Sequence, residues 1–91
     1  MHLVEFTFAK PPRAPEISSD AVLAALWAVC GPADGVEHIR VHASRAGARG
    51  AAFLLAPDEA QAVRQYRAVC RRALAASAAL RDWRLALPTE A

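Results

Sequence analysis

Two histidines and an arginine occupy alternate positions of one short segment in this sequence, as His38, Arg40 and His42. An imidazole exchanges protons near neutral pH and a guanidinium binds carboxylates and phosphates, so this trio is suited to acid–base chemistry or anion binding. Alternate residues of a strand share one face, and positions four apart are separated by about 13 Å. That distance is too long for both histidines to bind one metal ion, and we expect no metal site.

Other candidate catalytic groups are sparse. If the protein is an enzyme, Glu5 joins the trio as a fourth polar group, although it belongs to a different predicted strand two strand spacings away. The sequence has no G-x-S-x-G segment, and Ser44 has no base beside it. Asp58 and Glu59 are explained by the start of a helix. We therefore expect neither nucleophilic catalysis nor a cofactor.

The bulk composition is that of a folded domain, with 91 residues, 55% hydrophobic, 22% charged and a net charge of +2. This charge is too small to imply nucleic acid by itself. No segment reaches the ~18 apolar residues that span a membrane, and the N-terminus has no signal-peptide pattern. We expect a cytoplasmic protein without membrane contact. Ten arginines against one lysine, with no asparagine, indicate a high-GC bacterial genome.

Alternating apolar residues predict four strands. We expect them at 2–8, 36–43, 50–56 and 83–87. Ser18 or Ser19 is a candidate N-cap for a first helix over 21–30, which Gly31-Pro32 should stop.

A second helix is expected to begin at Pro57-Asp58-Glu59 and to run to about Ala79. The remaining segments are a proline-rich loop at 10–17, a basic hairpin loop at 44–50 and a tail at 88–91.

The predicted order βαββαβ resembles the ferredoxin-like fold. This resemblance covers nearly the whole chain and rests on element order alone. It implies a single α+β domain over 1–91, with a four-stranded antiparallel sheet in the order 4-1-3-2 and two helices on one face. The expected core consists of Val4, Phe6, Phe8, Val22, Leu26, Trp27, Ile39, Val41, Val63, Tyr66, Val69 and Leu85.

The first predicted helix has no charged side chain from position 21 to 33. Its core-facing stripe is expected to contain Val22, Leu23, Leu26, Trp27 and Cys30. Four alanines surface the opposite side, namely Ala21, Ala24, Ala25 and Ala28. Alanine is the best helix former, so this side is either a plain exposed surface or one that a partner covers.

The second predicted helix is amphipathic, and its apolar face contains Val63, Tyr66, Val69, Cys70 and Ala73. Its opposite side presents Arg64, Arg67 and Arg71, flanked by Gln61 and Arg72. Such a stripe is either solvated or docks on an acidic partner or on phosphates. Both cysteines fall on apolar helix faces, and we expect buried free thiols.

One face of the predicted sheet is left uncovered by the helices. Strand alternation assigns to it Leu3, Glu5, Thr7, His38, Arg40, His42 and Arg84. The third strand adds either Ala51, Phe53 and Leu55 or Ala52 and Leu54, and its pattern fits both. This mixed face suits a dimer interface or a small-molecule site, with His38, Arg40, His42, Phe53 and Arg84 as candidate contacts.

Two short segments are similar to RNA-binding signatures. Residues 49–54 (RGAAFL) resemble the start of the third-strand signature of RNA-recognition motifs, but Ala51 stands where an aromatic side chain would stack on a base. Residues 47–50 (GARG) are similar to the G-x-x-G of KH domains, yet they would join two strands instead of two helices. Nucleic-acid binding through Arg40, Arg45, Arg49 and Arg84 is therefore the weakest of our hypotheses.

The leading hypothesis is a small non-catalytic interaction module that forms a homodimer or docks on a partner protein. The alternative is a dimeric α+β-barrel-type enzyme without a cofactor, such as a monooxygenase, isomerase or cyclase. Such enzymes pack two ferredoxin-like sheets face to face, and this chain is similar to them in architecture only. Their polar site would lie on the open face of the sheet.

Overall fold

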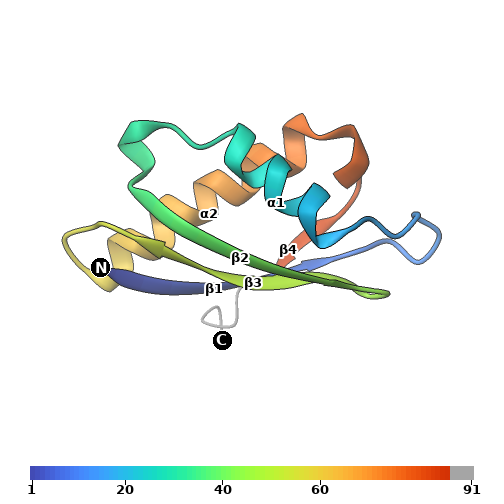
Figure 1. The fold of residues 1–91 in the computed structure, drawn as a ribbon, viewed down its shortest axis with the longest axis horizontal. Coiled ribbons are helices and arrows are strands. Elements are labelled where there is room, and N and C mark those ends of the chain that lie inside the picture. Colours follow the sequence, from blue (N-terminus) through green and yellow to red (C-terminus); the bar gives the residue numbers. More distant parts are fainter. Residues whose placement is uncertain (87–91) are drawn as a thin grey trace.

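The chain forms two layers, a four-stranded sheet and two helices packed on one of its faces (Figure 1). This computed structural model describes residues 1–86. The strands are β1 (His2–Ala9), β2 (Val36–Ser44), β3 (Gly47–Leu54) and β4 (Arg84–Ala86). The helices are α1 (Ser19–Ala28) and α2 (Glu59–Ala76), followed by the 3₁₀ turns η1 (Pro32–Asp34) and η2 (Ala78–Leu80), respectively. The predicted tail at 88–91 and the last residue of the predicted fourth strand lie outside the described residues.

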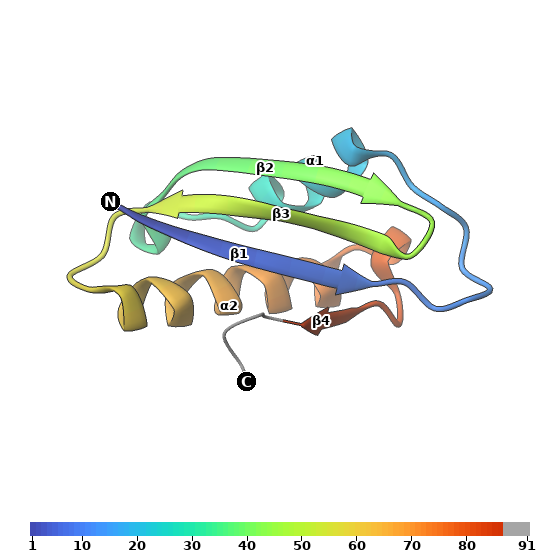
Figure 2. The same ribbon diagram turned by 90° about the horizontal axis from the view of Figure 1, so that it is seen from below.

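All paired strands are antiparallel, and their order across the sheet is β2-β3-β1-β4. This is the expected order 4-1-3-2 read from the opposite edge, so the α+β class and the antiparallel sheet are confirmed. Figure 2 shows the sheet from its uncovered side, with β2 along one edge. Within the described residues, β4 pairs with the last three residues of β1, from Thr7 to Ala9.

The two candidate N-cap serines have different roles. Ser18 is the N-cap of α1, and its Oγ accepts a hydrogen bond of 3.1 Å from the Ala21 amide. Ser19 is the first helical residue, and its Oγ accepts a 2.8 Å hydrogen bond from the Ala43 amide of β2. One serine therefore starts the helix, while the next ties the helix to the edge of the sheet.

The hairpin between β2 and β3 is tighter than the sequence pattern indicates. β3 begins at Gly47 and not at position 50, so only Arg45 and Ala46 form the turn and most of the expected loop at 44–50 is strand. Gly47 has a φ of 143°, and a Cβ added there would lie 2.0 Å from the Phe8 carbonyl oxygen. Glycine is required at this position because β1 and β3 approach closely at their ends.

Helix α2 ends earlier than expected. Asp58 is its N-cap and accepts a 2.8 Å hydrogen bond from the Gln61 amide. The helix stops at Ala76, because Ser77 adopts an extended conformation (φ −92°, ψ 119°). The turn η2 that follows buries Leu80 instead of prolonging the helix toward position 79.

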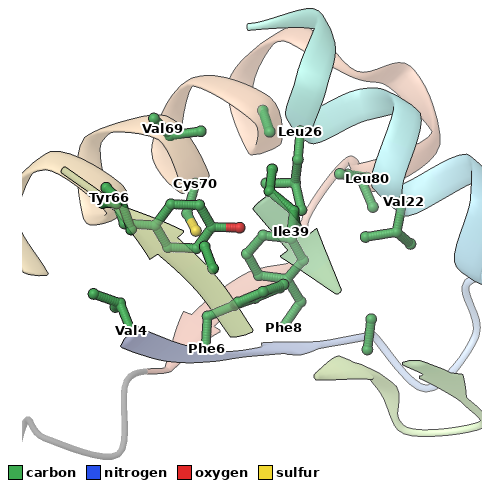
Figure 3. Packing of buried hydrophobic residues seen from close by; sticks show 14 of the residues in the cluster. Val4, Phe6, Phe8, Val22, Leu26, Ile39, Tyr66, Val69, Cys70 and Leu80 are labelled. Carbon is green, nitrogen blue, oxygen red and sulfur yellow. The ribbon is translucent and has the colours of Figure 1, made fainter. Parts of the chain in front are cut away.

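The core lies between the sheet and the two helices (Figure 3). The Phe6 ring centroid lies 5.3 Å from that of Phe8 and 5.3 Å from that of Tyr66, in tilted geometries that favour aromatic contact. Eight residues of the expected core are buried: Val4, Phe6, Phe8, Val22, Leu26, Ile39, Tyr66 and Val69.

Other members of the expected core differ. Trp27 was the wrong choice, since 40% of it is exposed. It lies about 100° around the helix from Leu26, outside the narrow arc of α1 that faces the sheet. Cys30 and three further residues, Val41, Val63 and Leu85, are only partly buried. The core also contains buried residues outside the expected set, namely Ala48, Ala52, Leu54, Ala62, Cys70, Ala73, Leu80 and Trp83.

Candidate functional site

The open face of the sheet is organised in three rows that cross β2, β3 and β1. The strand register defines them as His38–Phe53–Leu3, Arg40–Ala51–Glu5 and His42–Arg49–Thr7. Ala52 and Leu54 are buried, so the alternation of β3 is settled and Ala51 and Phe53 belong to the open face. Arg49, which the sequence pattern places in a loop, lies on the same face.

The middle row forms the floor of a hollow of about 800 Å³. Because Ala51 is small, this hollow lies between Arg40 on one neighbouring strand and Glu5 on the other. Two strand spacings separate these residues by about 10 Å. Among residues 1–86 neither of them has an ion-pair partner. The hollow is also lined by His42 and Arg49, so its described lining holds two arginines and one carboxylate.

The four candidate catalytic residues share this face but do not form a catalytic constellation. His38, Arg40, His42 and Glu5 are all exposed. No hydrogen bond joins any two of them in the part of the chain that is described. The His38 ring lies 6.4 Å from the Phe53 ring, which is a ring contact and not a proton path. Within residues 1–86 no group of three His, Cys, Asp or Glu side chains is placed to hold a metal ion.

One end of the sheet is apolar. Met1 is 70% exposed, Leu3 51% and Leu55 53%. Leu3 pairs with Phe53 across β1 and β3, and Met1 and Leu55 continue these two strands in the direction of the same end. The open face therefore has an apolar end beside a cationic middle. Arg84, paired with Ala9, adds a further exposed arginine at the opposite end.

The uncharged helix α1 differs from its predicted arrangement. Ala21, Ala24 and Ala28 are exposed as expected, but Ala25 packs against the core and does not belong to the outer surface. Trp27 takes its place among the exposed residues. The outer surface of α1 is consequently less smooth than four alanines would make it.

The arginines of α2 do not form a continuous stripe. Arg64 is exposed and donates a 2.6 Å hydrogen bond to the Gln61 side chain, and Arg71 is exposed. Arg67 is partly buried. Arg72 donates hydrogen bonds to an Asp34 carboxylate oxygen (2.6 Å) and to the Val29 carbonyl (3.1 Å). This side of α2 therefore mixes exposed arginines with arginines that hold the structure together.

Two buried or half-buried thiols lie apart from the open face. Cys70 is buried, and this burial raises the pKa of its thiol to about 12, although a contact with the Tyr66 hydroxyl acts in the opposite direction. Burial also raises the pKa of Cys30, with a smaller contribution from the Asp34 charge. Both groups are therefore protonated thiols at neutral pH, which makes them poor nucleophiles.

Comparisons with family models, with curated proteins and with solved structures found no match for this chain. Within residues 1–86 no helix is both long and apolar enough to cross a membrane.

Proposed function

We propose that this protein is a non-catalytic interaction module of ferredoxin-like architecture that binds a partner protein on its open sheet face. The element order, the strand order and the placement of both helices on one face support the architecture (Figure 1). The observation that carries the function is the combination, on one face, of an exposed apolar end with arginines that have no ion-pair partner among residues 1–86.

The chemistry of the partner follows from this combination. Leu3, Phe53 and their neighbours supply apolar area whose burial stabilises a complex by about 25 cal/mol per Å². Arg40 and Arg49 supply guanidinium groups, which are frequent energetic centres of protein interfaces and bind carboxylates in pairs of hydrogen bonds. The surface that fits best therefore carries carboxylates next to an apolar patch.

The same face disfavours a homodimer with two open faces in contact. Among the paired strand residues that the structure describes, it presents Arg40, Arg49 and Arg84 against one carboxylate, Glu5. Two such faces would bring arginines of equal charge together, which costs free energy. An acidic partner protein is therefore the occupant we propose, and the homodimer is an outcome that the experiment below can detect.

The enzyme hypothesis retains one favourable observation, the hollow beside His38 and His42. A general acid or base must be held within hydrogen-bond reach of its reactant, and a second group usually orients it. Neither imidazole has such an orienting partner within residues 1–86. The interaction module is therefore the better supported of the two functions.

The test is a selection of peptides from a random display library against the folded chain, followed by mapping of the bound site from backbone amide NMR shifts. We expect selected sequences rich in both acidic and large apolar residues, with shifts at Arg40, Arg49 and Phe53. Substitutions of Arg40 and Arg49 by glutamine should lower affinity about tenfold together. Substitutions of Arg64 and Arg71 on α2 are the matched control and should leave the affinity unchanged.

Two outcomes would contradict the proposal. Binding that maps onto α1 or α2 would move the interaction surface away from the sheet. A stable dimer of the free chain whose interface contains Leu3 and Phe53 would replace the heterologous partner by a second copy of the chain.

A further inference from the structure

The outer edge of β2 presents backbone groups that no neighbouring strand uses. The Ala43 amide points away from β3, because it donates to the Ser19 side chain of α1. Residues two apart on a strand point their backbone groups to the same side, so the N–H and C=O groups of Ile39 and Val41 point outward as well. In the part of the sheet that is described, β3 is the one strand that pairs with β2. Ile39 and Val41 therefore have backbone groups that no described strand pairs with; Val41 is partly exposed, whereas Ile39 is 4% exposed, so Val41 is the more accessible of the two.

This edge lies beside an apolar flank of α1. The helix packs mainly against β2 and lies over it in both views of the fold (Figures 1 and 2). Ser19, Leu23 and Trp27 follow each other at intervals of four residues, so they share one flank of the helix. Leu23 lines the same hollow as Ile39 and Val41, and the hollow thus continues from the open face over the edge of the sheet. Trp27, one turn further along, is 40% exposed.

The unpaired part of the β2 edge is bounded at both ends. At one end the Ala43 amide already donates a hydrogen bond to the Ser19 hydroxyl. A register shift between Val36 and His38 interrupts regular pairing at the other end. Between these limits, His38, Arg40 and His42 alternate on the open face. An added strand would place every second side chain directly beside this row and its central Arg40, about 5 Å away.

From these contacts we infer that the edge of β2 binds an extended acidic segment of the partner protein as a fifth strand of the sheet. The inference rests on the proposed interaction function and specifies its mode of recognition. Backbone hydrogen bonds to Ile39 and Val41 hold the segment. Its acidic side chains lie beside Arg40 on the open face, and its small apolar side chains point to Leu23 and Trp27.

A second copy of this chain fits the edge less well than an acidic segment. Two β2 strands paired about a two-fold axis at Arg40 place the two Arg40 guanidiniums opposite each other, and axes at Ile39 or Val41 place Arg40 opposite an imidazole and not opposite a carboxylate. Like charges directly opposite each other destabilise a strand pair. Acidic side chains at alternate positions remove this repulsion and turn it into attraction.

The experiment uses the full chain and an acetylated, amidated heptapeptide in which glutamate and valine alternate. We expect its binding to shift the Ile39 and Val41 amide signals and to slow their hydrogen exchange, because both amides gain hydrogen bonds. N-methylation of one alternate set of peptide amides should lower affinity at least about tenfold, since that set faces β2. N-methylation of the other set should leave the affinity unchanged. A peptide that alternates lysine and valine is the charge control and should not bind.

A protein variant tests the same edge from the other side. Val41→Pro removes an N–H that β3 does not use, and proline is tolerated on edge strands when its missing N–H faces outward. It should abolish peptide binding, while Val41→Thr keeps the N–H and should retain it. If Val41→Pro does not fold, the two methylated peptides decide the question alone.

The outcomes separate this inference from the proposed function. Peptide binding that is insensitive to methylation of either set, with shifts on β1 and β3 alone, overturns strand addition but leaves the open face as the interaction surface. If the heptapeptide does not bind but the selected library peptides map to the open face, strand addition is likewise overturned and the open face remains the interaction surface. Absence of any binder in either experiment overturns both.

Discussion

At the scale of single residues, the open face owes its hollow to Ala51. The residue stands between Arg40 and Glu5 in the middle row, and neither charged side chain has an ion-pair partner among residues 1–86. A larger residue at this position would fill the space that the hollow occupies. The polar character of the site therefore depends on a residue that is itself apolar.

Tyr66 provides a test of the core at the same scale. Its hydroxyl is buried without a hydrogen-bond partner of acceptable geometry among residues 1–86, although the Cys70 thiol lies close enough to interact. Removing an unsatisfied buried hydroxyl relieves a desolvation cost, so Tyr66→Phe should leave the free energy of unfolding unchanged or raise it by up to about 1 kcal/mol. Urea denaturation measures this. A loss above about 1 kcal/mol would mean that the hydroxyl is bonded after all.

Gly47 tests the close approach of β1 and β3. Gly47→Ala forces a side chain into a left-handed backbone conformation and against the Phe8 carbonyl, so we expect a loss of at least about 2 kcal/mol of unfolding free energy. Gly31→Ala is the matched control, because the nearest atom to its added Cβ is 3.7 Å away and its backbone is extended. Equal unfolding midpoints for the two variants would refute the steric argument.

At the scale of elements, α2 is joined to the α1–β2 connection by a polar clasp. The Asp34 carboxylate accepts hydrogen bonds from the Gly31 amide (2.7 Å) and from Arg72 of α2 (2.6 Å). The Gln65 side chain donates to the Asp34 carbonyl at 2.8 Å. These contacts hold the start of β2 in place, and with it the row of cationic residues on the open face.

Asp34→Asn tests the clasp. Partial burial raises the pKa of this carboxyl, but the hydrogen bond from Gly31 and the Arg72 charge outweigh it and hold the pKa below its ordinary value of 3.8. A lowered pKa means that the stabilisation is complete above the unfolded value and is lost as the pH falls through the folded one. We expect the variant to lose about 1 kcal/mol at pH 7 and to show a weaker acid dependence below pH ~4.

The control for this clasp is Asp82→Asn. Asp82 has no ion pair within residues 1–86 and a positive φ of 66°, which asparagine also tolerates. Thermal unfolding between pH 3 and pH 7 compares the two variants. Equal acid dependence in both would show that the Asp34–Arg72 pair contributes nothing to stability, as exposed pairs often do.

At the scale of the whole molecule, the charge of the open face opposes contact between the open faces of two copies of the chain. The formal charge is only +2, but within residues 1–86 the paired strands of the open face place Arg40 and Arg49 near one carboxylate, Glu5. We expect the free chain to remain monomeric at high micromolar concentration, because two such faces repel each other. Light scattering coupled to size-exclusion chromatography measures the mass.

If the free chain does form a dimer, the apolar end of the open face is one candidate interface, and single substitutions can identify the interface. If a dimer forms, Leu3→Asp should dissociate it when the open faces are in contact, while Ala24→Asp should dissociate it when α1 is the interface. A dimer sensitive to Leu3→Asp would contradict the repulsion argument.

Much of the architecture follows from the sequence alone. Alternation in the segments that became β1 and β2 placed Phe6 inside and Arg40 outside, because a strand that is buried on one face admits apolar residues at every second position only. The acidic pair Asp58 and Glu59 predicted the start of α2, because carboxylates are favourable at a helix N-terminus, and in the structure Asp58 is the N-cap. Strand alternation and helix starts depend on residues close together in the sequence, so they can be predicted without the tertiary structure.

The rest was decided by tertiary contacts. The extent of β3 depends on its pairing with both neighbours, which drew Gly47 and Arg49 out of the expected loop and onto the sheet. The exposure of Trp27 depends on how little of α1 the sheet covers. The free edge of β2 depends on which strand ends the sheet and on one serine of a distant helix. Sequence alternation determined which side chains share a face, but only the packed structure decided which faces and edges remain uncovered, because that depends on contacts between residues far apart in the chain.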